Sequence, residues 1–173
     1  MKIHLVAIAK SEEAYIEDWM LYYYNLGIDY ICIYDNNDYS LSDYSSRFIT
    51  LSTLKDKISS TNKEFYDYSL FKDCKDLKDF LTKSNRLKSY QDKYEVIKWN
   101  KNQAQAYKHY LNTHKDTFDW LLICDIDEFI DLNFYKDFKD LIHKNNNLKY
   151  ISFKWINYDD NDLIERDMSK PML

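Results

Sequence analysis

The sequence predicts an α/β fold in which a mostly parallel, Rossmann-like sheet is flanked by helices. An apolar segment, a helical segment and a second apolar segment follow one another at the N-terminus, which is the order of a strand–helix–strand unit. The apolar runs are continuous rather than alternating, which is typical of parallel strands buried on both faces. With 173 residues, the chain fits a single domain spanning residues 1–173.

The first strand–helix–strand unit covers the N-terminal part of the chain. Lys2–Ala9 is the first predicted strand. Ser11 is a good N-cap for the helix that follows, and the two glutamates after it suit the positive end of a helix. Gly27 ends this helix, where a left-handed backbone is favoured, and Asp29–Tyr34 is the second strand. One helix face is apolar at three- and four-residue steps: Tyr15, Trp19, Tyr22, Tyr23 and Leu26.

Residues 40–90 predict an insertion, partly helical, on the main sheet. The stretch is rich in charge and has no clear period. Within it, Phe48–Leu51 is a candidate short strand and Asp73–Leu81 a candidate helix.

The second half of the chain predicts three further strands and two helices. The strands are Lys93–Trp99, Phe118–Cys124 and Tyr150–Trp155, and the helices are Asn100–Leu111 and Tyr135–His143. The side chains expected to pack are Ala104, Tyr107, Tyr110 and Leu111 in the first helix and Phe138, Leu141 and Ile142 in the second.

Composition excludes several classes of function. The net charge of -5 argues against a general nucleic-acid binder, and no apolar run approaches the ~20 residues that span a bilayer. A single glycine excludes glycine-rich phosphate loops, and the four histidines lack a spacing suited to zinc. The N-terminus shows no signal peptide, and Cys32, Cys74 and Cys124 are typical of reduced core cysteines, so we expect a cytoplasmic protein.

An acidic cluster follows the fourth predicted strand. Five apolar residues run into Asp125, Asp127 and Glu128. Parallel sheets bind ligands at the carboxyl ends of their strands, and residues two apart share a face of an extended backbone. The aspartates would therefore present oxygens to one hard divalent cation, Mn²⁺ or Mg²⁺, and with it a phosphate. The alternative is that they only cap the next turn or pair with lysines.

The order of several short motifs resembles GT-A-fold glycosyltransferases, close to family 2 and to the family 92-like group. The resemblance covers most of the chain outside residues 40–90. Its motifs are Lys10-Ser11-Glu12-Glu13, Glu17-Asp18-Trp19, Leu26-Gly27, Tyr34-Asp35-Asn36-Asn37, Trp99, Gln103-Ala104-Gln105-Ala106-Tyr107 and Asp125-Ile126-Asp127-Glu128-Phe129.

The resemblance implies a metal-dependent transferase that moves a sugar from a nucleotide-diphosphate donor, a UDP-sugar, to a glycan or lipid-linked acceptor. Bacterial surface-polysaccharide synthesis is the implied setting, in the cytoplasm or peripherally at the inner face of the membrane. Asp127 would bind the metal, and Asp125 the metal or the ribose.

Further nucleotide contacts are implied at the exits of the other strands: Ala9, Lys10, Glu12, Asp35, Asn36 and Gln103. Three of these have simpler alternatives. Asp35 also suits a turn, Glu12 a helix dipole, and Gln103 a solvated helix start.

The acceptor side is implied by the C-terminal residues. Trp155 is a candidate for stacking on an acceptor sugar, with a core position as its alternative, and an inverting transfer needs a general base. The candidate bases are Asp159 and Asp162, beside Asp160 and Glu165. Family members generally continue beyond this point, so we expect further acceptor-side structure in them that these 173 residues do not hold.

Two rival functions remain. A haloacid-dehalogenase-type phosphatase also places Asp-x-Asp after an apolar strand, but Phe129 stands where that family prefers Thr or Val, and its nucleophile tends to lie on the first strand. The other rival is a non-catalytic nucleotide-sugar-binding remnant that works only with a partner subunit.

Overall fold

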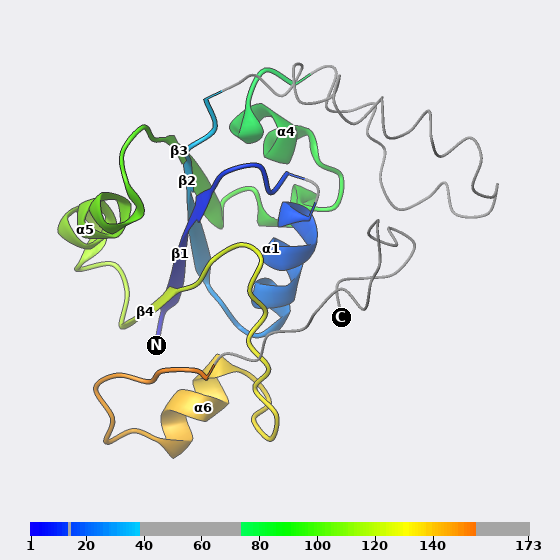
Figure 1. Ribbon diagram of the computed structural model, residues 1–173. Helices are drawn as coiled ribbons and strands as arrows, with labels where there is room; N and C mark the ends of the chain where they lie inside the picture. Colours follow the sequence, from blue (N-terminus) through cyan, green and yellow to red (C-terminus); the bar gives the residue numbers. More distant parts are fainter. Residues whose placement is uncertain (14, 39–73, 155–173) are drawn as a thin grey trace, which may run out of the picture.

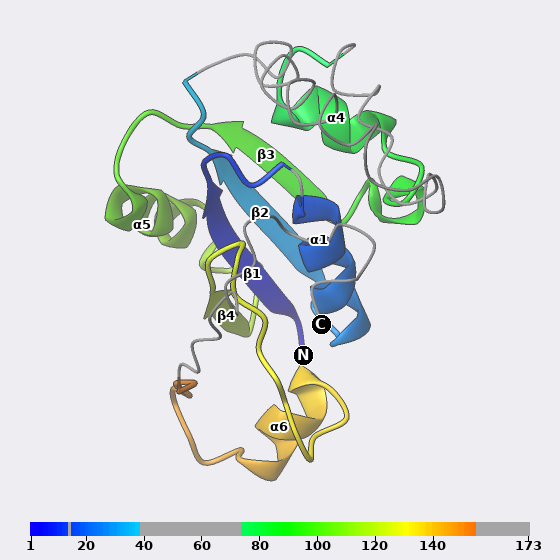
Figure 2. The same ribbon diagram turned by 45° about the vertical axis from the view of Figure 1, so that its right-hand side comes forward.

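A computed structural model describes residues 1–13, 15–38 and 74–154 and shows an α/β fold (Figure 1). All pairings in its four-stranded sheet are parallel, and the strand order is β3-β2-β1-β4 (Figure 2). The strands are β1 (Ile3–Ala9), β2 (Tyr30–Asp35), β3 (Tyr94–Lys98) and β4 (Trp120–Ile123). The predicted Rossmann-like fold class is confirmed.

The register of the sheet aligns the ends of three strands. Ala9 pairs with Asp35, and Asp35 pairs with Lys98, so β1, β2 and β3 finish side by side. The last pair of β4 joins Ile123 to Val6, three residues before β1 ends. The loops that leave these strands therefore meet at one edge of the sheet.

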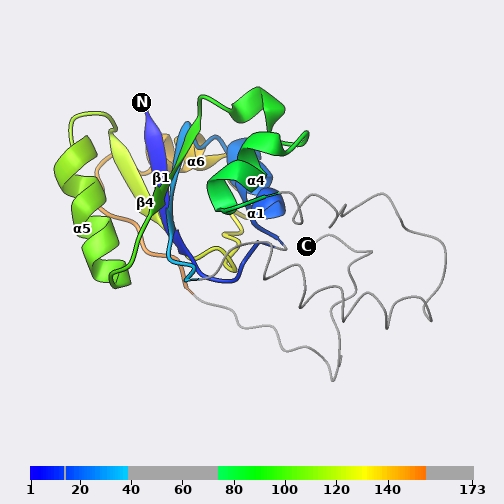
Figure 3. The same ribbon diagram turned by 90° about the horizontal axis from the view of Figure 1, so that it is seen from above.

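Helices cover both faces of the sheet. Helix α1 (Ile16–Asn25) links β1 to β2 on one face, and α5 (Gln103–His114) links β3 to β4 on the other (Figures 1 and 3). The chain moves outward from β1 to β3 and then returns to the other side of β1. The strand order thus reverses between β1 and β4, and such a switch point opens a ligand crevice at the carboxyl ends of the strands.

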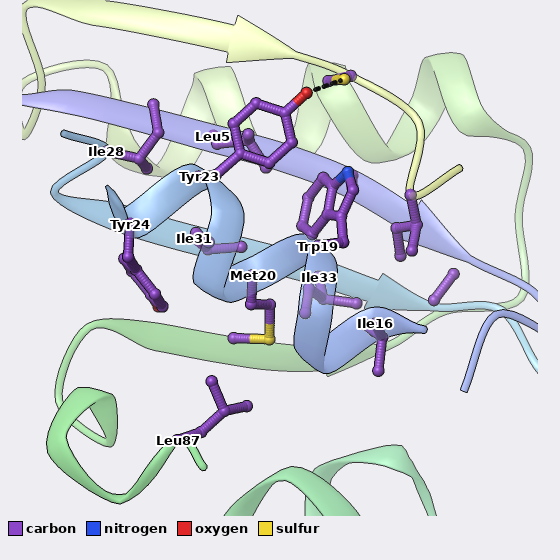
Figure 4. Close-up of a cluster of buried hydrophobic side chains, with 14 of the residues drawn as sticks. Leu5, Ile16, Trp19, Met20, Tyr23, Tyr24, Ile28, Ile31, Ile33 and Leu87 are labelled. Atoms are coloured by element: carbon purple, nitrogen blue, oxygen red, sulfur yellow. Dashed lines mark hydrogen bonds between the residues drawn. The ribbon is translucent and has the colours of Figure 1, made fainter. Parts of the chain in front are cut away.

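The larger core lies between α1 and the sheet (Figure 4). Trp19, Met20 and Tyr23 of α1 are fully buried and belong to one cluster with Leu5 and Ile33 of the sheet. Full burial of each large apolar side chain stabilises the fold by about 1.5–3 kcal/mol. The predicted inward positions of Trp19 and Tyr23 are confirmed.

The first helix begins later than predicted. Tyr15 is its N-cap and Ile16 its first residue, whereas Ser11 has a left-handed φ of 74°. The amide of Ser11 donates to Asn37 Oδ1 at 2.8 Å, so a contact with the next loop sets its conformation and not a helix start. The acidic residues in the first helical turn are Glu17 and Asp18 rather than the glutamates at positions 12 and 13.

The end of α1 is as predicted. Gly27 has a φ of +87°, which only glycine adopts without strain. Its amide donates to Tyr24 O at 3.0 Å, and the amide of Ile28 donates to Tyr23 O at 3.1 Å.

The described part of the predicted insertion is helical. It contains α4 (Leu77–Lys83) and a 3₁₀ turn, η1 (Lys88–Tyr90). Phe48–Leu51 lies outside the described residues. Aspartate or asparagine caps three helices: Asp76 caps α4, Asn102 caps α5, and Asp137 caps α6 (Phe138–Lys144).

Two of the four residues of α5 that were predicted to pack do not do so. Ala104 and Leu111 are exposed, and the stripe that faces the sheet contains Ala106 and Tyr110. The docking of α5 on β1 and β2 selects this stripe, since the helix carries apolar residues on more than one side. In α6 the three predicted inward residues are buried.

Two strand predictions are also wrong. Residues 150–154 form no strand; Ile151 and Phe153 instead pack on the α1-side core, with Phe153 edge-on to Phe138. Trp155 lies outside the described residues. Strand β4 is not buried on both faces: Ile123 is 50% exposed, and within the described sheet β4 pairs only with β1. None of the helices in the described ranges is both long enough and apolar enough to cross a membrane.

Candidate functional site

The acidic residues after β4 form a tight turn rather than an extended segment. The amide of Glu128 donates to Asp125 O at 3.1 Å, and the Glu128 carboxylate accepts from the Asp125 amide at 3.1 Å. Ile126 is buried inside the turn, and Asp127 is exposed at its tip. The prediction that Asp125 and Asp127 share a face of extended backbone is therefore wrong, because the chain reverses as soon as β4 ends.

Helix α1 holds this turn through its aromatic side chains. Trp19 Nε1 donates to the carbonyl oxygens of Asp125 at 3.0 Å and Glu128 at 3.1 Å. The Tyr23 hydroxyl lies 3.1 Å from Glu128 O and 3.0 Å from Cys124 Sγ (Figure 4). These two aromatic residues were predicted only as packing residues, and their apolar spacing gave no sign of this polar contact.

The Asp125 carboxylate is oriented by the first turns of α5. Gln103 Nε2 donates to Asp125 Oδ1 at 2.6 Å, and the Tyr107 hydroxyl lies 3.5 Å from the same oxygen. Burial raises the pKa of Asp125, as do the charges of Glu128 and Asp127, and the contacts from α5 act in the opposite direction. Gln103 thus lies against the acidic turn, and Tyr107 joins it because residues four apart share a helix face.

The loop after β1 lies close to the same turn. Burial is the main cause that raises the pKa of Glu12 to about 7, and the charges of Glu13 and Asp127 add to it. The backbone amide of Lys10 donates to the Glu12 carboxylate and opposes this rise. The side chain of Ala9 is buried, and its backbone carbonyl oxygen accepts a hydrogen bond from the Asn36 amide at 2.9 Å. The Glu12 carboxylate, in the loop after β1, therefore lies within electrostatic range of Asp127, in the turn after β4.

Asp35 is a structural anchor at the end of β2. Its side chain is 4% exposed, and both carboxylate oxygens accept hydrogen bonds, Oδ1 from the Asn37 amide at 3.1 Å and Oδ2 from Lys98 Nζ at 3.2 Å. This geometry is that of the turn former that the sequence offered as an alternative, and it points Lys98 into the site.

Asn37 connects the loops after β1 and β2 to the end of β3. Its buried side chain accepts a hydrogen bond from the Ser11 amide at 2.8 Å and donates one to Glu13 Oε1 at 2.6 Å. Its backbone carbonyl oxygen accepts from Lys98 Nζ. Glu13 is only 3% exposed, and its Oε2 makes no hydrogen bond to any described residue. Burial raises the pKa of this carboxyl group. The sequence placed Asn37 only in a polar cluster, because its long-range partners are not visible there.

A pocket of about 800 Å³ opens at the carboxyl ends of β1, β2 and β3. It is mostly polar and carries three lysines against one aspartate. Its lining residues are Lys10, Asn36, Asn37, Asp38, Lys98, Trp99, Asn100, Lys101 and Asn102. Asn102 is followed directly by Gln103, so the pocket borders the acidic turn.

The acidic turn offers carboxylate oxygens, which are the ligands that a hard cation prefers. Among the residues that the structure describes, no group of three or more His, Cys, Asp or Glu side chains is arranged to hold a metal. Mg²⁺ commonly takes only one or two carboxylates and completes its coordination with phosphates and water. Asp127 is exposed at the tip of the turn and so offers one carboxylate of this kind.

Three of the predicted site residues lie outside the described ranges: Trp155, Asp159 and Asp162. Comparison of the chain with protein-family models, with curated proteins and with solved structures finds no significant match.

Proposed function

We propose that this protein is a metal-dependent glycosyltransferase that moves a sugar from a UDP-sugar to a glycan or lipid-linked acceptor. The observation that carries the proposal is the position of the acidic turn. It follows β4 and lies beside the loop after β1, at the point where the strand order reverses. This is the crevice in which parallel α/β sheets bind their ligands.

The two aspartates differ in exposure and in hydrogen bonding, and both properties suit this role. Asp127 is exposed and offers oxygen ligands, whereas Asp125 is fixed by Gln103 and Tyr107. The bonds from Trp19 hold the turn itself. When bound, Mn²⁺ or Mg²⁺ would stabilise the charge that develops on the leaving diphosphate. Because α1 and α5 already fix the turn and the Asp125 carboxylate, little reorganisation is needed as that charge forms.

Other residues would contact the two substrates. Asn36, half-buried at the end of β2, is the proposed contact for the base or ribose, with Asp35 acting through Lys98. Trp155 is proposed for the acceptor sugar, and Asp159 or Asp162 as the general base. We place the reaction in the cytoplasm, in the synthesis of a bacterial surface polysaccharide.

Titration of UDP into the protein with and without Mn²⁺, combined with an assay of UDP-sugar hydrolysis, tests the proposal. Binding that requires Mn²⁺, together with turnover, is the expected result. Metal-dependent binding without turnover would instead identify a nucleotide-sugar-binding remnant. Hydrolysis of a phosphate monoester without UDP binding would overturn the proposal in favour of a phosphatase.

A further inference from the structure

The pocket beside the acidic turn is lined by lysines and not by the acids of the turn. Its lining holds Lys10, Lys98 and Lys101 but neither Asp125 nor Asp127. We propose that this pocket binds a phosphate group through its lysines without a divalent cation. The pocket shares Asn36 with the proposed donor site, but the inference goes beyond the transferase, because phosphate binding by the lysines needs neither the acidic turn nor a transfer reaction.

Lys98 is held in place by two acceptors. Its Nζ donates to Asp35 Oδ2 at 3.2 Å and also to the carbonyl oxygen of Asn37. An ammonium group has three N–H donors, so one is left for a ligand. The side chain of Lys98 is 61% exposed and lines the pocket, whereas that of Asp35 is 4% exposed. Asp35 thus orients Lys98 from beneath and offsets its charge.

Lys101 is positioned by an aromatic ring. Its Nζ lies 5.6 Å from the centroid of the Trp99 ring, within the range of a cation–π contact. Trp99 is itself fixed: its amide donates to Asp35 O at 2.8 Å, its Nε1 donates to Asn102 O at 3.3 Å, and its ring meets Tyr34 edge-on. An ammonium held in this way loses less conformational freedom when it binds a ligand.

The balance of charge in the pocket favours an anion. Asp35 offsets Lys98, which leaves Lys10 and Lys101 against Asp38. Lysine is a common phosphate binder as a point charge, and a phosphate offers several acceptor oxygens to converging ammonium groups. The pocket of about 800 Å³ lies in the range of small-molecule sites and exceeds the needs of a lone phosphate. The pocket thus has room for a larger ligand that carries the phosphate, either a nucleotide or a phosphorylated sugar.

Calorimetric titration of inorganic pyrophosphate in the presence of EDTA tests the site. The wild-type protein should bind, and Lys101→Gln should weaken binding about 10-fold, since the loss of one charged hydrogen bond has an effect of that order. Lys98→Gln should also weaken binding, and its thermal melting shows whether loss of the Asp35 partner affects folding. Lys108→Gln is the matched control, because Lys108 is exposed on α5 and does not line the pocket.

Absence of pyrophosphate binding in EDTA, or equal binding by wild type and folded Lys101→Gln, would overturn the inference. Parallel titrations of UDP and glucose 6-phosphate in EDTA distinguish the two sources of the phosphate. The ligand that binds more tightly is the one whose nucleoside or sugar part also fits the pocket. Asp127→Asn should keep this metal-free binding even if it loses Mn²⁺-dependent UDP binding, so failure of this site and failure of the proposed transferase give different results.

Discussion

The indole nitrogen of Trp19 bridges the carbonyl oxygens of Asp125 and Glu128, at 3.0 Å and 3.1 Å, and so joins the first helix to the acidic turn. These residues are more than 100 positions apart in the sequence. The bridge closes the turn from its buried side and leaves Asp127 exposed at the tip.

Replacement of Trp19 by phenylalanine should loosen this turn. Trp19→Phe removes the indole donor to both carbonyl oxygens and creates a small cavity. Asp125 O keeps the Glu128 amide and Glu128 O keeps the Tyr23 hydroxyl, so the free energy of unfolding should fall by about 1–3 kcal/mol. Urea denaturation measures this loss. Mn²⁺-dependent UDP binding should weaken as well, about 10-fold, because the turn is no longer held in one position.

Tyr22→Phe is the control for this variant. It removes the donor to Ile130 O, outside the turn, and should reduce stability by about 1 kcal/mol without changing UDP binding. If Trp19→Phe lost stability but bound UDP as the wild type does, the bridge would have no role in the site.

Asp127→Asn should abolish Mn²⁺-dependent UDP binding, because an amide is a much weaker ligand than a carboxylate for a hard cation. Its stability should stay within about 0.5 kcal/mol of wild type, since the side chain is exposed. Calorimetry with and without Mn²⁺ measures the first effect and thermal melting the second. Asp116→Asn removes the same charge from an exposed position away from the turn and should bind normally. Retained metal-dependent binding in Asp127→Asn would contradict the assignment.

Glu12 should make stability depend on pH. Its pKa is raised from 4.5 to about 7 in the folded protein. Between these values the unfolded chain loses a proton that the folded protein keeps, so the contribution of Glu12 to stability is complete below about 4.5 and is lost as the pH rises through about 7. Glu12→Gln should therefore lose less stability than wild type between about pH 5 and about pH 8.

Urea denaturation at the two pH values measures the difference. Asp92→Asn, which changes an exposed acid, should keep the wild-type pH dependence. An unchanged pH dependence in Glu12→Gln would show that Glu12 titrates normally in the folded protein.

Asn37→Ala should be strongly destabilising. The change removes the acceptor for the Ser11 amide and the side-chain donor to the buried Glu13 carboxylate. A loss of about 2–4 kcal/mol is expected, because a buried acidic group is left without its partner. Chemical denaturation measures it, with Asn36→Ala as the neighbouring control that should cost much less. Similar losses in both variants would show that Asn37 does not connect the loops as described.

The sequence predicted the order of elements and the edge of the sheet at which the polar loops meet. Continuous apolar runs mark β1 and β2, and the helical spacing of Trp19 and Tyr23 marks the buried face of α1. Gly27 marks the end of that helix. These signals are local, since they depend on periodicity, on turn chemistry and on the conformational freedom of one residue.

Other features were predicted wrongly, because the prediction again used only the local sequence. Ser11 has the chemistry of an N-cap, but its amide donates to Asn37. Tyr150–Trp155 was predicted as a strand, but Ile151 and Phe153 pack on the core, and Phe153 contacts Phe138 of α6. In each case a long-range partner decided between two conformations that the local sequence allowed.

The sequence by itself therefore determined the α/β class, the strand–helix–strand order and the placement of acids after β4. Only the tertiary structure decided that these acids form a turn held by Trp19, that Asp35 is committed to Lys98 and Asn37, and that three lysines share one pocket. The physical reason is distance along the chain: hydrogen bonds and charge pairs between loops of different strands arise only when the parallel sheet brings the ends of those strands together.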